Sequence, residues 1–65
     1  MNANQIAQLI GLTTQAYCNY QIDAKDTADL TAALFKLAEE RGVHKETVAA
    51  VREFKVQNYE APANG

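Results

Sequence analysis

Few side chains in this sequence could support catalysis. The 65 residues include one cysteine, Cys18, one histidine, His44, and no serine. A Ser/His/Asp triad and a multi-histidine metal site are therefore excluded, and nothing places an orienting group or an oxyanion hole beside Cys18 and His44. Glu39 and Glu40 are adjacent, so on a helix they diverge, unlike the carboxylates of a paired site. The sequence predicts no enzyme, no metal site, no cofactor and no small-molecule substrate.

The hydroxyl and amide side chains that follow Gly11 have a different chemistry. Threonine, glutamine and asparagine are residue types that hydrogen-bond the edges of bases in the DNA major groove. Our candidate DNA-binding residues are therefore Thr13, Thr14, Gln15 and Asn19, together with Cys18, which lies among them.

A helix-turn-helix would position these side chains. Such a unit needs a small residue on its first helix, a glycine at the turn and apolar anchors on the second helix. Ala7 stands four residues before Gly11, and Tyr17 and Tyr20 supply the anchors. The spacing predicts a helix over 4–10, a left-handed turn at Gly11 and a second helix over 14–21, with Thr13 as its N-cap.

The stretch AQLIGLTTQAYCNYQ, residues 7–21, resembles the helix-turn-helix of Cro/C1-type (XRE-like) DNA-binding domains. The matching residues are Ala7, Gly11, Leu12, Thr13, Gln15, Ala16 and Tyr20. The stretch LFKLAEERGVHKETV, residues 34–48, is similar to the fourth and fifth helices of that family. The resemblance implies a small transcriptional regulator that binds duplex DNA in the major groove.

A second segment has the same spacing 31 residues later. Leu37 and Ala38 precede Gly42 and Val43 as Ile6 and Ala7 precede Gly11 and Leu12, and Val48 and Val51 take the anchor positions. This copy is an alternative DNA-reading unit. Its candidate surface consists of His44, Lys45 and Arg52.

The periodicity of the whole chain is helical, and no segment reads as a strand. Leucine and alanine recur at helical spacing over 27–41, where Asp26 has the chemistry of an N-cap and Gly42 ends the helix, and a further helix is expected over 45–56. We therefore expect an all-α, compact array of four to five short helices, with one domain over 1–57 and a flexible tail over 58–65. The expected core is Ile6, Leu9, Ile10, Leu12, Tyr17, Leu30, Leu34, Leu37, Val48 and Val51.

The charge pattern favours a second class of function. Residues 1–22 carry no charged side chain, and the formal net charge of the chain is −2, which gives no general attraction to nucleic acid. The alternative function is therefore an acidic protein-binding module, such as a phage- or plasmid-type inhibitor or anti-regulator. We also expect a homodimer, because the first helix of the Cro/C1-type family has no counterpart before Asn4.

The expected location is the cytoplasm. No apolar run approaches the ~20 residues that span a bilayer, and the N-terminus lacks the basic start of a signal peptide. A lone cysteine suits a reducing compartment. These features predict no membrane partner.

Overall fold

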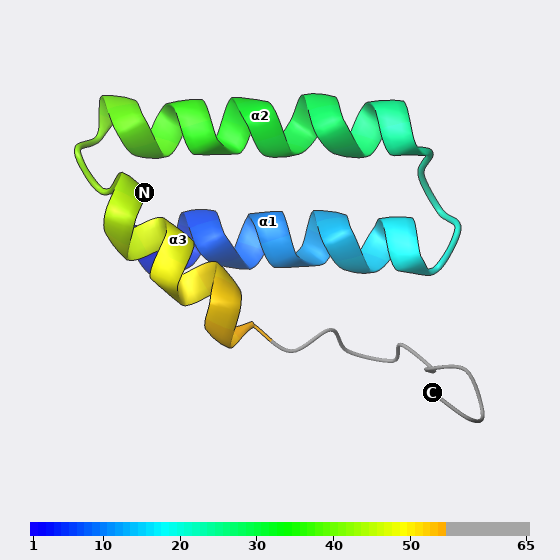
Figure 1. Cartoon of the computed structure of the whole chain (residues 1–65), viewed down its shortest axis with the longest axis horizontal. Coiled ribbons are helices and arrows are strands. Elements are labelled where there is room, and N and C mark those ends of the chain that lie inside the picture. The colour runs from blue at the N-terminus through cyan, green and yellow to red at the C-terminus, as the bar shows by residue number, and fades with distance from the viewer. Residues whose placement is uncertain (55–65) are drawn as a thin grey trace.

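The computed structural model describes residues 1–54, which form three helices (Figure 1). They are α1 (Ala3–Cys18), α2 (Ala24–Glu40) and α3 (His44–Glu53). The all-α prediction is confirmed, but the described part has three helices where four to five were expected. The predicted end of the last helix at 56, the domain boundary at 57 and the tail over 58–65 lie outside the described residues.

The helix break predicted at Gly11 is wrong, because α1 is continuous. Asn2 is its N-cap and forms a capping box with Gln5: each backbone N–H donates to the other residue's side-chain oxygen over 2.9 Å. Thr13 caps nothing. Its hydroxyl donates to the carbonyl of Leu9 at 2.8 Å, one turn back within the same helix. The threonine hydroxyl is thus satisfied inside the helix and does not end it.

Gly11 serves helix packing rather than a turn. It is buried in the middle of α1, and a Cβ built on it would overlap the ring of Phe54, the residue that caps α3. Glycine in a helix interior costs about 1 kcal/mol relative to alanine. The close packing of the Phe54 ring against Gly11 offsets that cost. Gly11 therefore marks the point where α3 crosses α1 and not a break in α1.

The first two helices end in the same way. The N–H of Gln21 donates to the carbonyl of Ala16 at 2.8 Å, and the N–H of Val43 donates to the carbonyl of Ala38 at 2.9 Å. Both are Schellman motifs, which need a left-handed residue just before the donor. Gly42 fills that position after α2 with φ +71°, which confirms Gly42 as the end of the helix. After α1 the left-handed residue is Tyr20, with φ +61°.

Asp23, and not Asp26, is the N-cap of α2. The Asp23 carboxylate accepts from the N–H of Asp26 at 2.7 Å, and this bond starts the helix three residues earlier than the pattern predicted. Asp26 lies in the first turn, where its negative charge suits the helix dipole.

The core is small and centred on α1. Ile6, Ile10 and Ala38 form its buried cluster, against which other side chains are partly buried: Leu34, Phe35, Leu37, Val43 and Val51. Val48 is half-buried. The predicted core placement is wrong for four residues that the structure leaves exposed: Leu9, Leu12, Tyr17 and Leu30.

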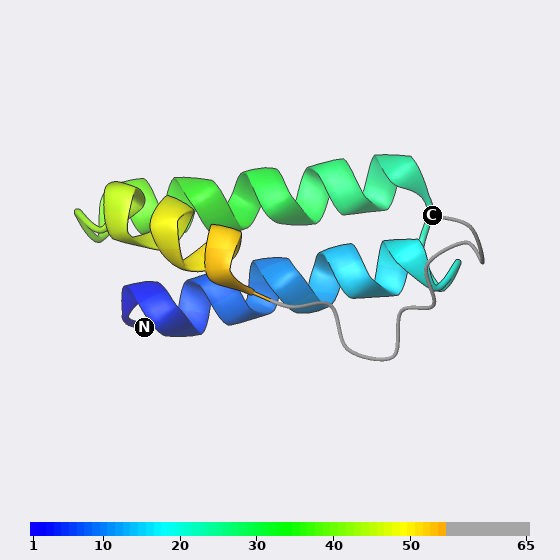
Figure 2. The ribbon, with the colours of Figure 1, turned by 60° about the horizontal axis from the view of Figure 1, so that its bottom comes forward.

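Helix α1 is the centre of the arrangement. It packs extensively against both α2 and α3, whereas α2 and α3 touch each other less. Helix α3 crosses one half of the α1–α2 hairpin and leaves the half near the connection between them without a third helix (Figure 2). Among the described helices, only α3 packs on the hairpin, and it covers one side of it.

Candidate functional site

The candidate residues of α1 do not all share one side of the helix. Thr14 lies beside Cys18, and Gln15 beside Asn19, at a spacing of four residues, whereas Thr13 points elsewhere. Successive residues of an α-helix are about 100° apart, so Thr13, Thr14 and Gln15 point in three directions from a continuous α1. The Thr14 hydroxyl donates to the carbonyl of Ile10 at 3.0 Å. Cys18 is half-buried, and so is Asn19, which caps the C-terminus of α1. Without the turn at Gly11 there is no separate recognition helix in this segment.

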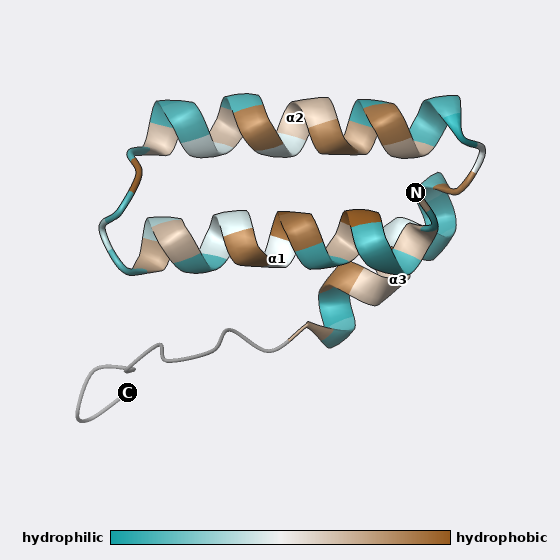
Figure 3. Cartoon of the chain, turned by 180° about the vertical axis from the view of Figure 1, so that it is seen from behind, coloured by the Kyte–Doolittle hydropathy of each residue, from teal (hydrophilic) through white to brown (hydrophobic). Residues whose placement is uncertain are grey.

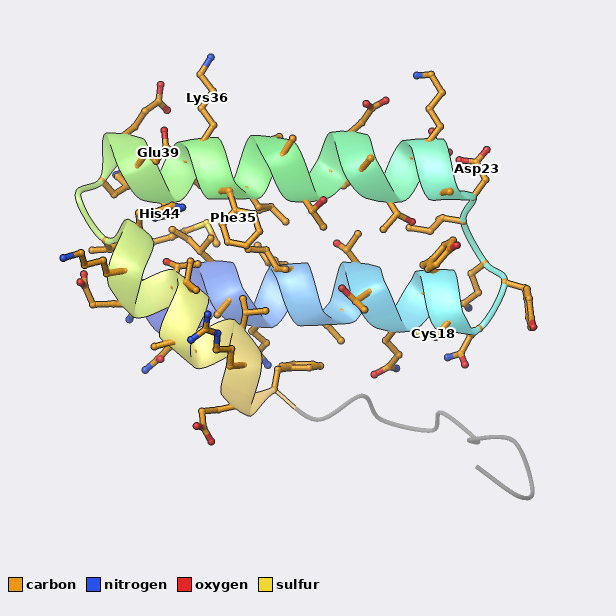
Figure 4. The ribbon with its side chains drawn as sticks, in the orientation of Figure 1. Cys18, Asp23, Phe35, Lys36, Glu39 and His44 are labelled. Atoms are coloured by element: carbon orange, nitrogen blue, oxygen red, sulfur yellow. The ribbon has the colours of Figure 1, made fainter. Side chains whose placement is uncertain are left out.

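A helix, a turn and a helix do occur at the second copy of the pattern. Helices α2 and α3 are joined through Gly42, and the second candidate surface lies on the shorter of the two. His44, Lys45 and Arg52 are all exposed. The His44 ring packs against Phe35 of α2, with centroids 5.8 Å apart and planes tilted by 56° (Figure 4). The structure thus has two helices joined by a glycine turn over this segment.

The outer side of α3 carries both signs of charge. Lys45 and Arg52 are seven residues apart and share one stripe, about 10 Å apart along the axis. Glu46 and Glu53 form a parallel acidic stripe, also exposed. Alternating charge of this kind is typical of a solvated helix face. The surface offers two cations to a phosphate backbone and two carboxylates that oppose it.

The opposite side of the α1–α2 hairpin is apolar, and we call it the back face. Gly11 faces α3, and Leu9 lies two residues away, which is about 200° around α1. Phe35 likewise contacts α3, and Ala33 and Leu37 lie about 200° from it on α2. The back face consists of Leu9 and Leu12 with Met1 at their edge from the α1 side, and of Leu30, Ala33 and Leu37 from α2.

Large apolar side chains of the back face are open to solvent. Leu9, Leu12 and Leu30 are 41%, 45% and 47% exposed, and Met1 is similar. Brown hydrophobic segments occur along both helices when the hairpin is viewed from behind (Figure 3). A hollow of about 230 Å³ lies at the α1 side, lined by Met1, Gln5, Gln8, Leu9 and Leu12. Contiguous exposed apolar patches of more than a few hundred Å² are typical of interaction sites.

Charge is confined to the two ends of the back face. The α1 side has no charged side chain, because residues 1–22 carry none. Along α2, the exposed residues Asp26 and Arg41 continue the stripe of Leu30, Ala33 and Leu37 at spacings of three and four residues. Asp26 lies near the α1–α2 connection. Arg41 lies at the turn before α3, beside the exposed Glu40, which also continues the stripe three residues after Leu37.

Sequence reasoning missed the back face because it divided α1 into two short helices. On a continuous helix, Ile6 and Ile10 fall on one stripe, and Leu9 falls roughly 60–100° to the side of it. The signal was therefore present as two apolar stripes on one helix. Reading it requires knowing that the helix does not break at Gly11.

Within residues 1–54, no helix is long and apolar enough to cross a membrane. The same residues contain no group of three or more His, Cys, Asp or Glu side chains placed to hold a metal ion. Comparison with protein-family models, with curated proteins and with solved structures finds no match to the chain.

Proposed function

We propose that this protein is a non-catalytic association module that binds a protein surface through its back face. The observation that carries the proposal is the group of large apolar side chains, each nearly half exposed, on a hairpin face that no described helix covers. Burying a fully exposed leucine is worth about 1.5–3 kcal/mol, so each of these half-covered side chains contributes roughly half of that when a partner covers it.

The chemistry of the partner follows from the surface. A face without charge in its middle favours a partner helix that is equally apolar and uncharged, because a charge buried there would lose its hydration without gaining a counter-charge. The glutamines beside the leucines, Gln5 and Gln8, line the hollow and provide hydrogen bonds at its rim. We propose an inhibitor or anti-regulator of the phage or plasmid type as the class of this module. We propose a cytoplasmic setting, where Cys18 stays reduced.

A photo-crosslinking side chain at position 12 tests this proposal. The matched control is position 36 on the outer side of α2, where Lys36 points away from α1 (Figure 4). We expect protein adducts from position 12 and none from position 36 when each variant is irradiated in a lysate of its source cells. Equal labelling at the two positions, or no adduct from position 12, contradicts the proposal.

DNA binding by the α2–turn–α3 unit is the second candidate function. The turn at Gly42 and the exposed cations Arg41, Lys45 and Arg52 favour it. Such a surface would bind the phosphate backbone of duplex DNA, and a role as a transcriptional regulator would rest on it. The two carboxylates on the outer side of α3 and the net charge of −2 weaken the attraction.

Salt dependence of duplex binding tests the second candidate. If Lys45 and Arg52 contact phosphates, Lys45→Ala and Arg52→Ala each reduce the slope of log affinity against log salt by about 1. Lys25→Ala on the opposite end of α2 is the control and leaves the slope unchanged. Absence of measurable duplex binding by the unmodified protein at low salt removes this candidate.

A further inference from the structure

We infer that the partner of the back face is a second copy of this chain, packed face to face and antiparallel about a two-fold axis that lies across the helices. This inference rests on the proposed function and names its partner. In this arrangement α1 faces α1 of the other copy, and α2 faces α2.

The charges at the ends of the back face favour this arrangement. An antiparallel two-fold axis brings the Asp26 end of one α2 against the Arg41 end of the other, and it does so twice. A two-fold axis along the helices would instead set each α2 against α1 of the other copy, which has no charged side chain, so neither pair would form. Opposite charges at the rim of an interface fix its orientation.

The apolar residues also match about the same axis. Ala33 lies midway between Asp26 and Arg41 on α2, so the axis passes near it, and Leu30 of one copy then lies against Leu37 of the other. In the antiparallel hairpin, Leu9 of α1 is at a similar level to Ala33, so the two copies of Leu9 meet near the axis. The net charge of −2 makes two copies repel each other weakly, and the middle of the back face adds no charge to that repulsion.

The area of the back face sets the expected affinity of the dimer. Four side chains about half exposed, with their polar neighbours, give on the order of 500 Å² per copy, below the about 800 Å² of a standard interface. The dimer is therefore expected to dissociate on dilution within the micromolar range. Covering this surface also enlarges a core whose buried apolar side chains, among the described residues, are only Ile6, Ala7, Ile10 and Ala38.

Charge reversal provides a specific test by sedimentation velocity. Asp26→Arg alone and Arg41→Asp alone each place like charges at both rims, so each variant is expected to self-associate at least tenfold more weakly than the unmodified protein. An equimolar mixture of the two variants restores both opposite-charge pairs and is expected to form the heterodimer. Lys36→Asp, on the outer side of α2, is the control and leaves the dimer intact.

Disulfide cross-linking tests the same dimer without changing any charge. It replaces the charge-reversal test if circular dichroism shows that Asp26→Arg or Arg41→Asp unfolds α2. With Cys18→Ala as background, Ala33→Cys lies near the axis and is expected to form a cross-linked dimer under mild oxidation. Ala32→Cys is exposed on another side of α2 and is the control. Equal cross-linking of the two variants overturns the inference.

The outcomes separate the inference from the proposed function. A mixture of the charge variants that associates no better than either alone overturns the antiparallel dimer. If photo-adducts from position 12 contain a different protein and no second copy of this chain, the inference fails and the proposed function stands. If position 12 gives no adduct, both fail.

Discussion

The contact of Gly11 with Phe54 decides how α3 sits on α1. Gly11→Ala gains about 1 kcal/mol of helix propensity but pushes a methyl group into the Phe54 ring, and overpacking costs about 1–3 kcal/mol. We expect the variant to unfold at lower urea concentration than the unmodified protein. In a Phe54→Ala background the same change should become stabilising by about 1 kcal/mol. A gain in stability in the unmodified background would show that the ring does not sit on Gly11.

The buried environment of Thr47 predicts how its substitution changes the free energy of unfolding. Its side chain is fully buried, and its hydroxyl oxygen has no hydrogen-bond partner. Thr47→Val keeps the shape and removes the unsatisfied group, so it should raise the free energy of unfolding by about 1–3 kcal/mol. Thr31→Val is the matched control, because the Thr31 hydroxyl donates to the carbonyl of Thr27 at 2.8 Å and its removal should bring no gain. Chemical denaturation of both variants measures the difference.

At the scale of elements, the two Schellman motifs make opposite predictions for their left-handed residues. Tyr20 is 96% exposed, so Tyr20→Gly loses little contact and should stabilise the fold by about 1 kcal/mol through relief of the positive φ. Gly42→Ala should cost about as much, since nothing lies within 4 Å of a Cβ at Gly42 and only the backbone strain is measured. We expect the melting temperature of Tyr20→Gly to rise above that of the unmodified protein and the melting temperature of Gly42→Ala to fall below it. A loss of stability in Tyr20→Gly would mean that the tyrosine makes a stabilising contact.

The start of α2 depends on its cap. Asp23→Ala removes the side-chain acceptor of the Asp26 N–H and should destabilise the fold by about 0.5–2 kcal/mol. Asp29→Ala carries the same charge change but breaks only the exposed ion pair with Lys25, N to O 3.1 Å, which is worth little. Equal midpoints for the two variants in urea would show that α2 does not start at the Asp23 cap.

At the scale of the whole molecule, the small core sets the tolerance to substitution. Leu34 packs against the buried cluster, and Leu34→Ala should cost about 2–5 kcal/mol, which is comparable to the entire stability of a domain of this size. Leu30→Ala removes a similar side chain from the back face and should cost far less when measured at a concentration where the protein is a monomer. Similar melting curves for the two variants would place both leucines in the same environment.

The sequence by itself determined the helical class and the features that depend on local interactions. The periodicity over 27–41 located α2, and Gly42 marked its end because a left-handed residue there is set by the backbone alone. These conclusions needed no knowledge of which helix packs on which.

Only the tertiary structure decided whether Gly11 breaks a helix and which apolar residues are covered. A glycine costs about 1 kcal/mol in a helix, and a single packing contact outweighs that local preference. Ile10 and Leu9 are equally apolar, but only the position of the neighbouring helices makes one buried and leaves the other on the back face. Burial depends on contacts between segments far apart in the chain, and the pattern within one helix does not contain that information.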